Sequence, residues 1–153
     1  MNQQSENFII QSWSEHEVRS VYDMVVLLAH FEKEPDAVIT TPEDYLEAFK
    51  NGLISGHLAK TENGNIAGMT LFYETFSTWK GKMLYLEDFF VLQEFRNKGV
   101  GDLLFEAYVN EAKIRKCTSL KWQVLDWNDQ AVRFYEKRGA EILKDWWTCR
   151  VIL

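Results

Sequence analysis

A glycine-containing, positively charged loop lies where a predicted strand runs into a predicted amphipathic helix: Arg96-Asn97-Lys98-Gly99-Val100-Gly101. Glycines allow the backbone to approach a ligand closely, and the first N–H groups of the helix point at a negative group, helped by the helix dipole. Arg96 and Lys98 add positive charge. The loop therefore indicates a cradle for an anion, although this R-x-x-G-x-G pattern alone is more often a plain structural turn.

The loop is not a P-loop, because no Gly-Lys-Ser/Thr follows. It is also a poor dinucleotide-binding fingerprint, because the strand before it belongs to a long meander and does not open a βαβ unit.

Two adjacent acids, Glu87 and Asp88, stand in the otherwise apolar strand that precedes the loop. Neighbours on a strand face opposite sides, so alternation predicts that one acid faces a cleft and the other does not. An acid in such a strand requires a partner or a function. The alternative is a structural ion pair with a neighbouring Lys or Arg. Further acids that would make a pocket for a di- or polycation, if they converge, are Glu32, Asp126 and Asp145.

The composition excludes several classes of function. Lys and Arg number 17 against 23 Asp and Glu, a net charge of −6, which argues against a nucleic-acid partner. No apolar run approaches the roughly 18 residues of a membrane helix, and MNQQSENFII lacks the pattern of a signal peptide, so we expect a cytoplasmic protein without a membrane partner. Cys117 and Cys149 have no CxxC spacing and the three histidines are scattered, so no metal site is expected.

The elements that position these residues follow from periodicity. Helices are predicted over residues 14–31, 42–50, 99–116 and 128–138, and strands over residues 8–13, 53–60, 66–76, 82–91, 120–125 and 146–153. Ser14 with Glu17 forms a capping box, and Asn128 is the expected N-cap of the last helix. The three middle strands form an antiparallel meander, and the following strand–helix–strand passage requires a parallel pair. The length of 153 residues, without repeat or linker, predicts one domain over 1–153.

Together, the loop at 96–101 and the segment at 127–140 resemble the GNAT superfamily of acyl-CoA-dependent N-acyltransferases. There an R/Q-x-x-G-x-G/A loop holds the CoA pyrophosphate, and an N-x-x-A-x-x-F-Y-x-x-x-G segment lines the acetyl and pantetheine end. Within the superfamily the sequence is most similar to the spermidine/spermine (diamine) and thialysine N-acetyltransferases, through residues 28–32, 79–91, 96–101 and 127–140. The resemblance implies an α/β GNAT fold, with a mixed, mostly antiparallel central sheet flanked by helices on both faces.

The resemblance also implies a reaction: direct transfer of acetyl from acetyl-CoA to a primary amine of a small cationic acceptor, namely a polyamine, a diamine or a lysine-like amino acid. An alkylammonium has a pKa near 10 and must lose its proton before it attacks. Glu87 resembles the family residue that takes this proton through water, with Asp88 assisting or binding the ammonium. Tyr135 resembles the general acid that protonates the CoA thiolate; the alternative is a core tyrosine with a bonded hydroxyl.

Binding residues follow from the same resemblance. Acetyl-CoA is expected to contact the backbone of Phe89, Phe90 and Val91, then Arg96, Asn97, Lys98, Gly99, Val100 and Gly101, and finally Asn128 and Tyr135. The acceptor is expected to contact Phe31, Glu32, Glu87, Asp88 and Asp145. No metal is implied.

Two features depart from the family: the segment between Ala140 and Trp147 is short, and the sequence ends at Leu153 without the usual further residues. The tryptophans near the C-terminus indicate an interface between two copies, because aromatic residues are enriched at interfaces. The resemblance implies the same, since members of the family are usually dimers. The alternatives are an acyltransferase for another acceptor, such as a protein amine, and a non-catalytic CoA-binding sensor; the intact Glu87, Tyr135 and loop argue against the sensor. Neither cysteine falls in a nucleophile motif, which disfavours an acyl-enzyme.

Overall fold

A computed structural model describes residues 7–153, which form two compact units, one reaching to Trp122 and one over Gln123–Leu153. Each unit is described by itself, and the single domain expected over 1–153 stays a prediction. Residues 1–6, part of the stretch from which the lack of a signal peptide was predicted, lie outside the described residues.

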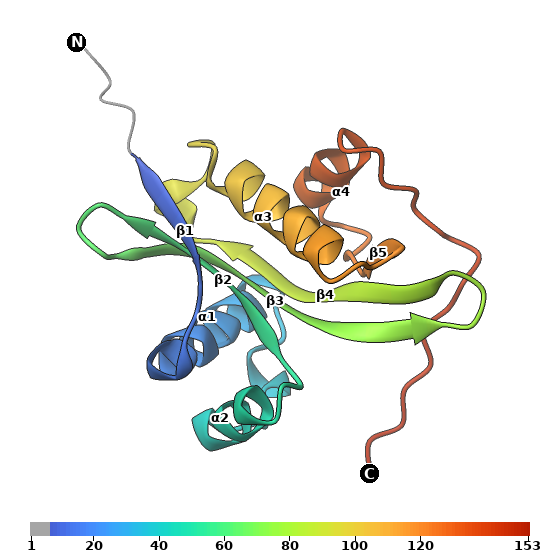
Figure 1. Cartoon of the computed structure of the whole chain (residues 1–153), viewed down its shortest axis with the longest axis horizontal. Helices are drawn as coiled ribbons and strands as arrows, with labels where there is room; N and C mark the ends of the chain where they lie inside the picture. Colours follow the sequence, from blue (N-terminus) through green and yellow to red (C-terminus); the bar gives the residue numbers. More distant parts are fainter. Residues whose placement is uncertain (1–6) are drawn as a thin grey trace. The chain divides into compact units, whose positions relative to one another are not determined.

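The first unit contains a five-stranded sheet in the order β1 (Phe8–Ser12), β2 (Ser55–Thr61), β3 (Ile66–Ser77), β4 (Gly81–Val91) and β5 (Ser119–Trp122) (Figure 1). The first three pairings are antiparallel and β4 pairs with β5 in parallel. The predicted meander and the mixed, mostly antiparallel sheet are thus confirmed, with the first four strands within two residues of their predicted bounds. β5 ends at Trp122, three residues earlier than predicted.

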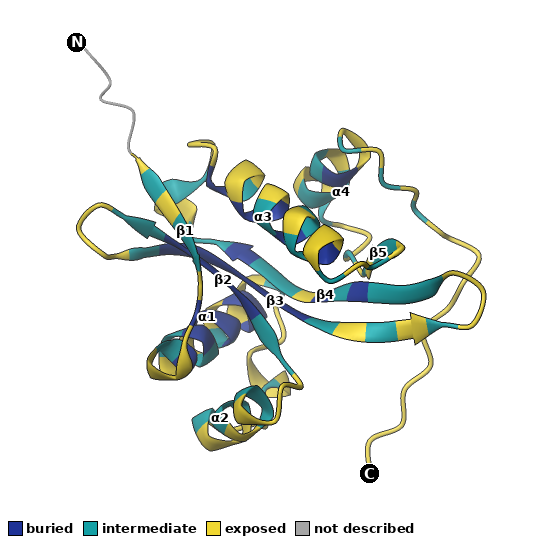
Figure 2. Ribbon diagram, in the orientation of Figure 1, coloured by how far each residue is buried: buried dark blue, intermediate teal, exposed yellow. Residues whose placement is uncertain are grey.

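Helices cover both faces of this sheet, as predicted (Figure 1). α1 (Val18–Phe31) and α2 (Pro42–Lys50) lie on one face, where α1 packs on Leu58, Met69 and Leu71. α3 (Val100–Ile114) lies on the other face, on Ala59 and Ala67. One pair of strands supplies both cores, seen as the dark stripe in Figure 2. On β2 the neighbours Leu58 and Ala59 face opposite sides by alternation, and on β3 Ala67 faces the opposite side from Met69 because the register with β2 shifts there.

The predicted helix starts are confirmed, with one refinement. The Ser14 N–H donates to Glu17 Oε2 at 2.7 Å, as a capping box requires, but Glu15–Glu17 form a 3₁₀ turn before α1 begins. The Thr41 N–H donates to Asp44 Oδ2 at 2.7 Å at the start of α2, with Pro42 at the first helical position.

The second unit contains one helix, α4 (Asp129–Glu136), among its described residues. Its predicted cap is confirmed: Asn128 Oδ1 accepts from the Ala131 N–H at 3.2 Å. Gly139, just beyond the helix, has φ +80°, the left-handed conformation that favours glycine.

The strand predicted over residues 146–153 is wrong. These residues have no regular secondary structure, and the side chains of Trp146, Trp147, Val151 and Ile152 are exposed. A strand requires a neighbouring strand for its backbone groups, and the second unit has no strand among its described residues. Alternating apolar side chains are therefore not sufficient to make one.

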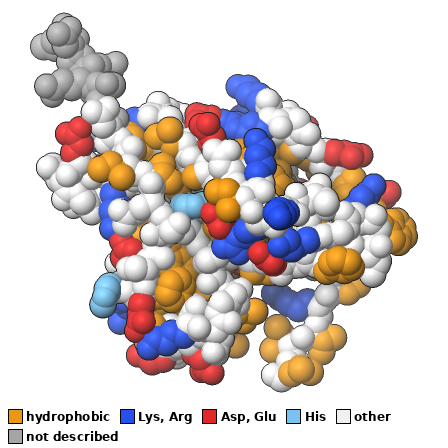
Figure 3. All heavy atoms as spheres, viewed as in Figure 1, with side chains coloured by type: hydrophobic (Ala, Val, Ile, Leu, Met, Phe, Trp, Pro, Cys, Tyr) orange, Lys and Arg blue, Asp and Glu red, His pale blue; other side chains and the backbone are white. Residues whose placement is uncertain are grey.

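One face of the molecule carries charges of both signs. On the face drawn in Figure 3, Lys and Arg side chains are interspersed with acidic and apolar ones. Within residues 7–153, no helix has the length and apolar character needed to cross a membrane.

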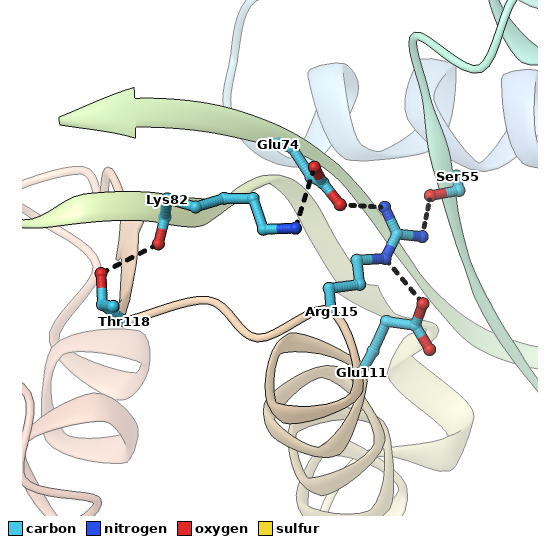
Figure 4. Close-up of polar contacts among 6 residues, drawn as sticks. All are labelled: Ser55, Glu74, Lys82, Glu111, Arg115 and Thr118. Atoms are coloured by element: carbon cyan, nitrogen blue, oxygen red, sulfur yellow. Dashed lines mark hydrogen bonds and ion pairs between the residues drawn. The ribbon is translucent and has the colours of Figure 1, made fainter.

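Arg115, just after α3, connects this helix to the sheet through polar contacts (Figure 4). Its guanidinium contacts Glu111 Oε1 at 2.7 Å, Ser55 Oγ at 2.9 Å and Glu74 Oε1 at 3.6 Å. Lys82 Nζ reaches the other oxygen of Glu74 at 3.5 Å. The cluster joins α3 to β2, β3 and β4, so it fixes the helix whose N-terminus carries the glycine loop.

We expect Arg115→Ala to lower the free energy of unfolding by about 1–3 kcal/mol, because it leaves several half-buried polar groups without their donor. Urea unfolding measures this as a lower midpoint at unchanged slope. The control is Arg19→Ala, which removes an exposed pair with Asp23 and should cost no more than about 0.5 kcal/mol. Equal effects of the two substitutions would show that the cluster contributes nothing beyond a surface ion pair.

Candidate active site

A β-bulge in β4 changes the direction of two acidic side chains. Leu86 pairs with Phe72 and Asp88 with Leu71, so Glu87 is an extra residue between adjacent partners. Both Glu87 and Asp88 line one pocket. The prediction from strand alternation, that only one of them would face a cleft, is wrong because a bulge interrupts the two-residue period.

The pocket into which both acids point has a volume of about 530 Å³, within the usual range for small-molecule sites. All its lining residues belong to the first unit, and they come from α1, α2, the segment between these helices, the residue before β2, β3 and β4. They are Val25, Ala37, Val38, Ile39, Thr40, Asp44, Tyr45, Ala48, Ile54, Leu71, Tyr73, Glu87 and Asp88. The described lining thus holds three carboxyl groups and two phenols and no Lys, Arg or His, which suits a cation.

Glu87 is held by a tyrosine on the neighbouring strand. The Tyr73 hydroxyl donates to Glu87 Oε2 at 2.6 Å, and the Tyr73 ring stacks on Tyr85 with centroids 5.3 Å apart and planes at 24°. Burial, and then the hydrogen bond to Glu87, raise the pKa of Tyr73 well above its usual value. The phenol is therefore a hydrogen-bond donor throughout the physiological pH range.

Asp88 lies in a different environment from Glu87, although the two are neighbours in sequence. No described residue donates a hydrogen bond to its carboxyl group. Burial, followed by the charges of Glu87 and Glu32, raises the pKa of Asp88 to about 7. Burial and then the charge of Asp88 raise the pKa of Tyr45, which lines the same pocket, to about 12. The site therefore contains a carboxyl group that exchanges its proton near neutral pH.

We expect Asp88→Asn to stabilise the fold at pH 8. The pKa of Asp88 rises from its usual 3.8 to about 7 on folding, so between these values the folded chain binds the extra proton and the wild type loses stability as pH rises. Asparagine does not titrate, so the variant does not lose this stability. The gain in its free energy of unfolding over wild type is small near pH 4, grows up to pH 7 and then stays constant. Urea midpoints at pH 5 and pH 8 measure it.

Asp23→Asn is the matched control, because Asp23 is an exposed acid on α1 paired with Arg19. It should give no gain that grows with pH. A stability difference for Asp88→Asn that is the same at both pH values would contradict the raised pKa of Asp88.

The strand that carries the acids has an open backbone edge. Pairing between β4 and β5 ends at Leu86 opposite Trp122, and no described strand pairs with residues 87–91 on that side. An edge without a neighbouring strand is a place where an extended ligand can pair, although the Val91 carbonyl here already accepts from Arg96 Nε. This edge includes Phe89, Phe90 and Val91, for which backbone contacts with acetyl-CoA were predicted.

The predicted anion loop follows directly on this edge. Asn97 and Gly99 have φ of +60° and +84°, and α3 begins at Val100, so the first N–H groups of the helix have no partners within it. A Cβ at Gly99 would meet no atom within 4 Å, so glycine is favoured there by its left-handed conformation and not by crowding. A strand edge that no described strand covers, followed by a helix N-terminus, is an arrangement that suits a ligand with an amide chain and a pyrophosphate.

The Arg96 side chain packs against the protein and is not directed wholly at solvent. Its Nε donates to the Val91 carbonyl at 3.0 Å, and its guanidinium lies over the rings of Phe31 at 4.6 Å and Phe90 at 5.7 Å. Arg96 thus fixes the turn from β4 into the loop. Phe31, predicted to contact the acceptor, lies against Arg96 and Phe90 and does not line the pocket.

The remaining predicted residues divide between the two units. Glu32 does not line the pocket, but its charge acts on Asp88, and burial raises the pKa of Glu32 itself. Tyr135 on α4 is buried and meets Phe134 edge to face at 5.5 Å, while Asp145 is exposed. Asn128, Tyr135 and Asp145 belong to the second unit, and their roles stay predictions.

Sequence reasoning missed three pocket residues: Asp44, Tyr45 and Tyr73. Asp44 has two roles, because it caps the start of α2 and also lines the pocket. Tyr73 faces Glu87 because of the bulge in the register between β3 and β4, and no sequence pattern marks where a bulge falls. A signal does exist for Tyr45, because it stands one turn into a helix whose apolar residues must pack on something.

Comparisons with known proteins agree with the fold and identify the family. Residues 18–140 match the acetyltransferase (GNAT) family. A thialysine N-epsilon-acetyltransferase of Caenorhabditis elegans is 32% identical over 130 residues, which cover 85% of this chain and 81% of that protein. An L-ornithine N5-acetyltransferase of Arabidopsis thaliana is 37% identical over 87 residues, 56% of this chain and 38% of that protein. A crystal structure of an aminoglycoside acetyltransferase from an uncultured soil metagenomic sample shares the fold, with a TM-score of 0.77, 18% identity, and 94% and 97% of the two chains covered.

Proposed function

The chain belongs to the acetyltransferase (GNAT) family and is an N-acetyltransferase, and from that premise we propose that it transfers acetyl from acetyl-CoA to a primary amine of a small cationic acceptor. The acceptor class is a polyamine, a diamine or a lysine-like amino acid. One observation carries the proposal: the bulge at Glu87 brings two carboxyl groups into a pocket at the point where the pairing of β4 with β5 ends.

The charge of the pocket supports a cationic acceptor. Asp44, Glu87 and Asp88 line it together with the phenols of Tyr45 and Tyr73, and its described lining offers no basic side chain. An amine with a second positive charge gains from this field, whereas an anionic acceptor is repelled. The names of the worm and Arabidopsis relatives, which specify thialysine and L-ornithine, agree with an acceptor of this kind.

The residues that would hold acetyl-CoA are the open edge of β4, residues 87–91, and the loop of residues 96–101. The edge offers backbone groups to the amide chain, and the start of α3 offers N–H groups and its dipole to the phosphates. Acetyl-CoA supplies an activated thioester carbonyl. The side chains of Arg96 and Lys98 contribute positive charge at the same end.

The reaction requires a proton acceptor for the amine and a proton donor for the thiolate. A C–N bond forms as the C–S bond breaks, the ammonium loses two protons overall, and the departing thiolate gains one. The carboxyl pair Glu87 and Asp88 is suited to accept the first proton, because a carboxyl group that titrates near pH 7 is an effective base at neutral pH. Tyr135 is the proposed acid for the thiolate. No covalent enzyme intermediate is required.

The test is release of CoA from acetyl-CoA by the purified chain with spermidine, spermine, putrescine, lysine, thialysine and a basic peptide. We expect turnover on at least one small amine, and none on the same amines after every amino group has been acetylated. Turnover on the peptide alone would replace the small acceptor by a protein amine. Tight CoA binding without turnover on any of them would favour a CoA-binding sensor.

We also propose that the enzyme is a cytoplasmic homodimer. The exposed apolar side chains near the C-terminus, Trp146, Trp147, Val151 and Ile152, support an interface there, because aromatic residues are enriched at such contacts. Sedimentation equilibrium of the chain would give twice the mass of one copy, and a monomer at high concentration would exclude the dimer.

A further inference from the structure

The acids of the acceptor pocket come from two of its walls. Glu87 and Asp88 belong to β4, whereas Asp44 belongs to the first turn of α2. Most of the other lining residues are apolar. The proposed function places the reacting amine at Glu87 and Asp88, so α2 faces the other end of the acceptor, here called its far end. A pocket with an acid at this end and apolar residues around it suits a methylene chain with a second charged group.

The capping role of Asp44 uses only one of its two carboxylate oxygens. The N–H and the hydroxyl group of Thr41 donate to Asp44 Oδ2 at 2.7 and 3.0 Å. No described residue donates to Oδ1, and Asp44 is exposed where it lines the pocket. The two hydrogen bonds hold the carboxylate in one orientation, so its second oxygen can accept from an ammonium group without losing the cap.

Glu43 shows what the helix alone requires of an acid at this place. It lies in the same first turn of α2 and is exposed, but it does not line the pocket. A negative charge on either residue stabilises the N-terminus of the helix through its dipole. Contact with the pocket is therefore the property that distinguishes Asp44 from Glu43.

Tyr45, the next residue, limits the space beside Asp44. It is half-buried, lines the pocket and packs against the core of the first unit. The ring of Tyr22 meets it edge to face, with centroids 5.3 Å apart and planes at 88°, which fixes its position. Burial and then the charge of Asp88 raise the pKa of Tyr45, so its hydroxyl end faces the acids of β4. The ring thus extends from α2 toward β4 and takes up part of the pocket.

We propose that the first turn of α2 recognises the far end of the acceptor: Asp44 binds a second ammonium group, and the ring of Tyr45 limits the length of the chain between the two amines. This inference rests on the proposed N-acetyltransferase function and adds two residues to the acceptor site. It ranks acceptors by the charge at the far end. Diamines and polyamines stand above an amino acid, whose carboxylate would meet Asp44 and has no basic side chain in the described lining.

Amines that differ at the far end test the role of Asp44. Cadaverine ends there in an ammonium group, pentylamine in a methyl group and ε-aminocaproate in a carboxylate, on chains of similar length. Wild type with saturating acetyl-CoA should give its highest kcat/KM with cadaverine, a lower value with pentylamine and the lowest with ε-aminocaproate. Lysine, which carries both charges at this end, should lie below cadaverine.

Asp44→Asn should lower kcat/KM for cadaverine about three- to tenfold, leave pentylamine within about twofold and raise ε-aminocaproate, because only a charged far end loses or gains a partner. Asparagine keeps an oxygen that can accept from Thr41. Glu43→Gln is the matched control: it removes a charge from the same turn but not from the pocket, so the ratio of cadaverine to pentylamine should stay as in wild type. Asp44→Glu keeps the charge and should retain most of the preference for cadaverine.

Diamines of increasing chain length, from diaminopropane to diaminooctane, test the role of Tyr45. Tyr45→Leu should move the highest kcat/KM to a diamine at least one methylene group longer, because it removes the outer part of the ring from the pocket. The matched control is Phe49→Leu. Phe49 lies one turn further along α2, packs on Trp13 at 4.9 Å and does not line the pocket, so the best chain length should stay the same.

The outcomes separate the inference from the function. If wild type acetylates amines but Asp44→Asn changes kcat/KM equally for cadaverine and pentylamine, or Glu43→Gln acts as strongly, Asp44 is only a capping acid and the function stands. An unchanged best chain length in Tyr45→Leu would contradict the role of its ring. Each comparison is a ratio between amines for one variant, so it holds even where a substitution lowers the folded fraction. No turnover by wild type on any amine would overturn both the function and the inference.

Discussion

Tyr135→Phe is expected to lower kcat by about 100- to 1000-fold, the range typical of a lost general acid. The substitution removes one hydroxyl from a buried side chain on α4 and keeps its ring and its contact with Phe134. The departing CoA thiolate then has no positioned proton donor, so the cost appears in the chemical step. Steady-state kinetics at saturating amine, together with CoA binding by calorimetry, should show a large loss in kcat and a change in Kd below about threefold.

Tyr22→Phe is the control for this experiment. The Tyr22 hydroxyl donates to the Thr40 carbonyl at 3.0 Å, and the residue lines no part of the pocket. It should keep kcat within about twofold. If Tyr135→Phe behaved in the same way, Tyr135 would be a packing residue and the thiolate would leave without help from the phenol.

The parts of this fold that the sequence predicts are those governed by local chemistry. Capping acids mark the starts of helices at Ser14 and Thr41, and the amide of Asn128 caps α4 as expected. Alternating apolar residues give the meander from β2 to β4. The turn into α3 is predictable for the same reason, because the left-handed conformation of Gly99 is a property of the backbone within a few residues; binding of an anion there stays a prediction.

The features predicted wrongly from the sequence are those that depend on pairing between segments far apart in the chain. The bulge at Glu87 is a property of the register between β3 and β4, so alternation assigns the two acids to opposite sides when they share one. Tyr73 reaches Glu87 for the same reason. Residues 146–153 show the opposite kind of error. Their apolar residues suit a strand, but the second unit has no described strand with which their backbone groups could form hydrogen bonds.

The bulge and the open edge of β4 arise at one point along the strand. Leu86 is the last residue paired with β5, and Glu87 is the next residue and the extra one opposite β3. A change in direction at this point releases β4 from β5 and aims two acids at the other side of the sheet. The acid-lined pocket and the proposed cofactor edge thus result from one local irregularity, so the proposed function would bring amine and acetyl-CoA to the same strand.

Gly56→Ala is expected to lower the free energy of unfolding by about 3 kcal/mol or more. A Cβ on Gly56 would lie 1.9 Å from the Thr70 carbonyl oxygen and 2.3 Å from Trp13 Nε1. Trp13 cannot move aside easily, because it is 3% exposed, donates to the Thr70 carbonyl at 3.3 Å and packs on Phe49 at 4.9 Å. Urea unfolding should give a much lower midpoint at unchanged slope.

Gly64→Ala separates crowding from backbone conformation. Gly64 has φ +83° but open space around it, so its substitution should cost only about 1 kcal/mol. Equal losses in the free energy of unfolding for the two variants would show that Trp13 and β3 shift easily to make room for the added Cβ. If Gly56→Ala is the larger, it should also lower the rate of acetyl transfer in the folded fraction, because Gly56 pairs with Leu71 and Leu71 pairs with Asp88. The crowded glycine Gly56, the pocket residue Leu71 and the acid Asp88 lie in one row across the sheet.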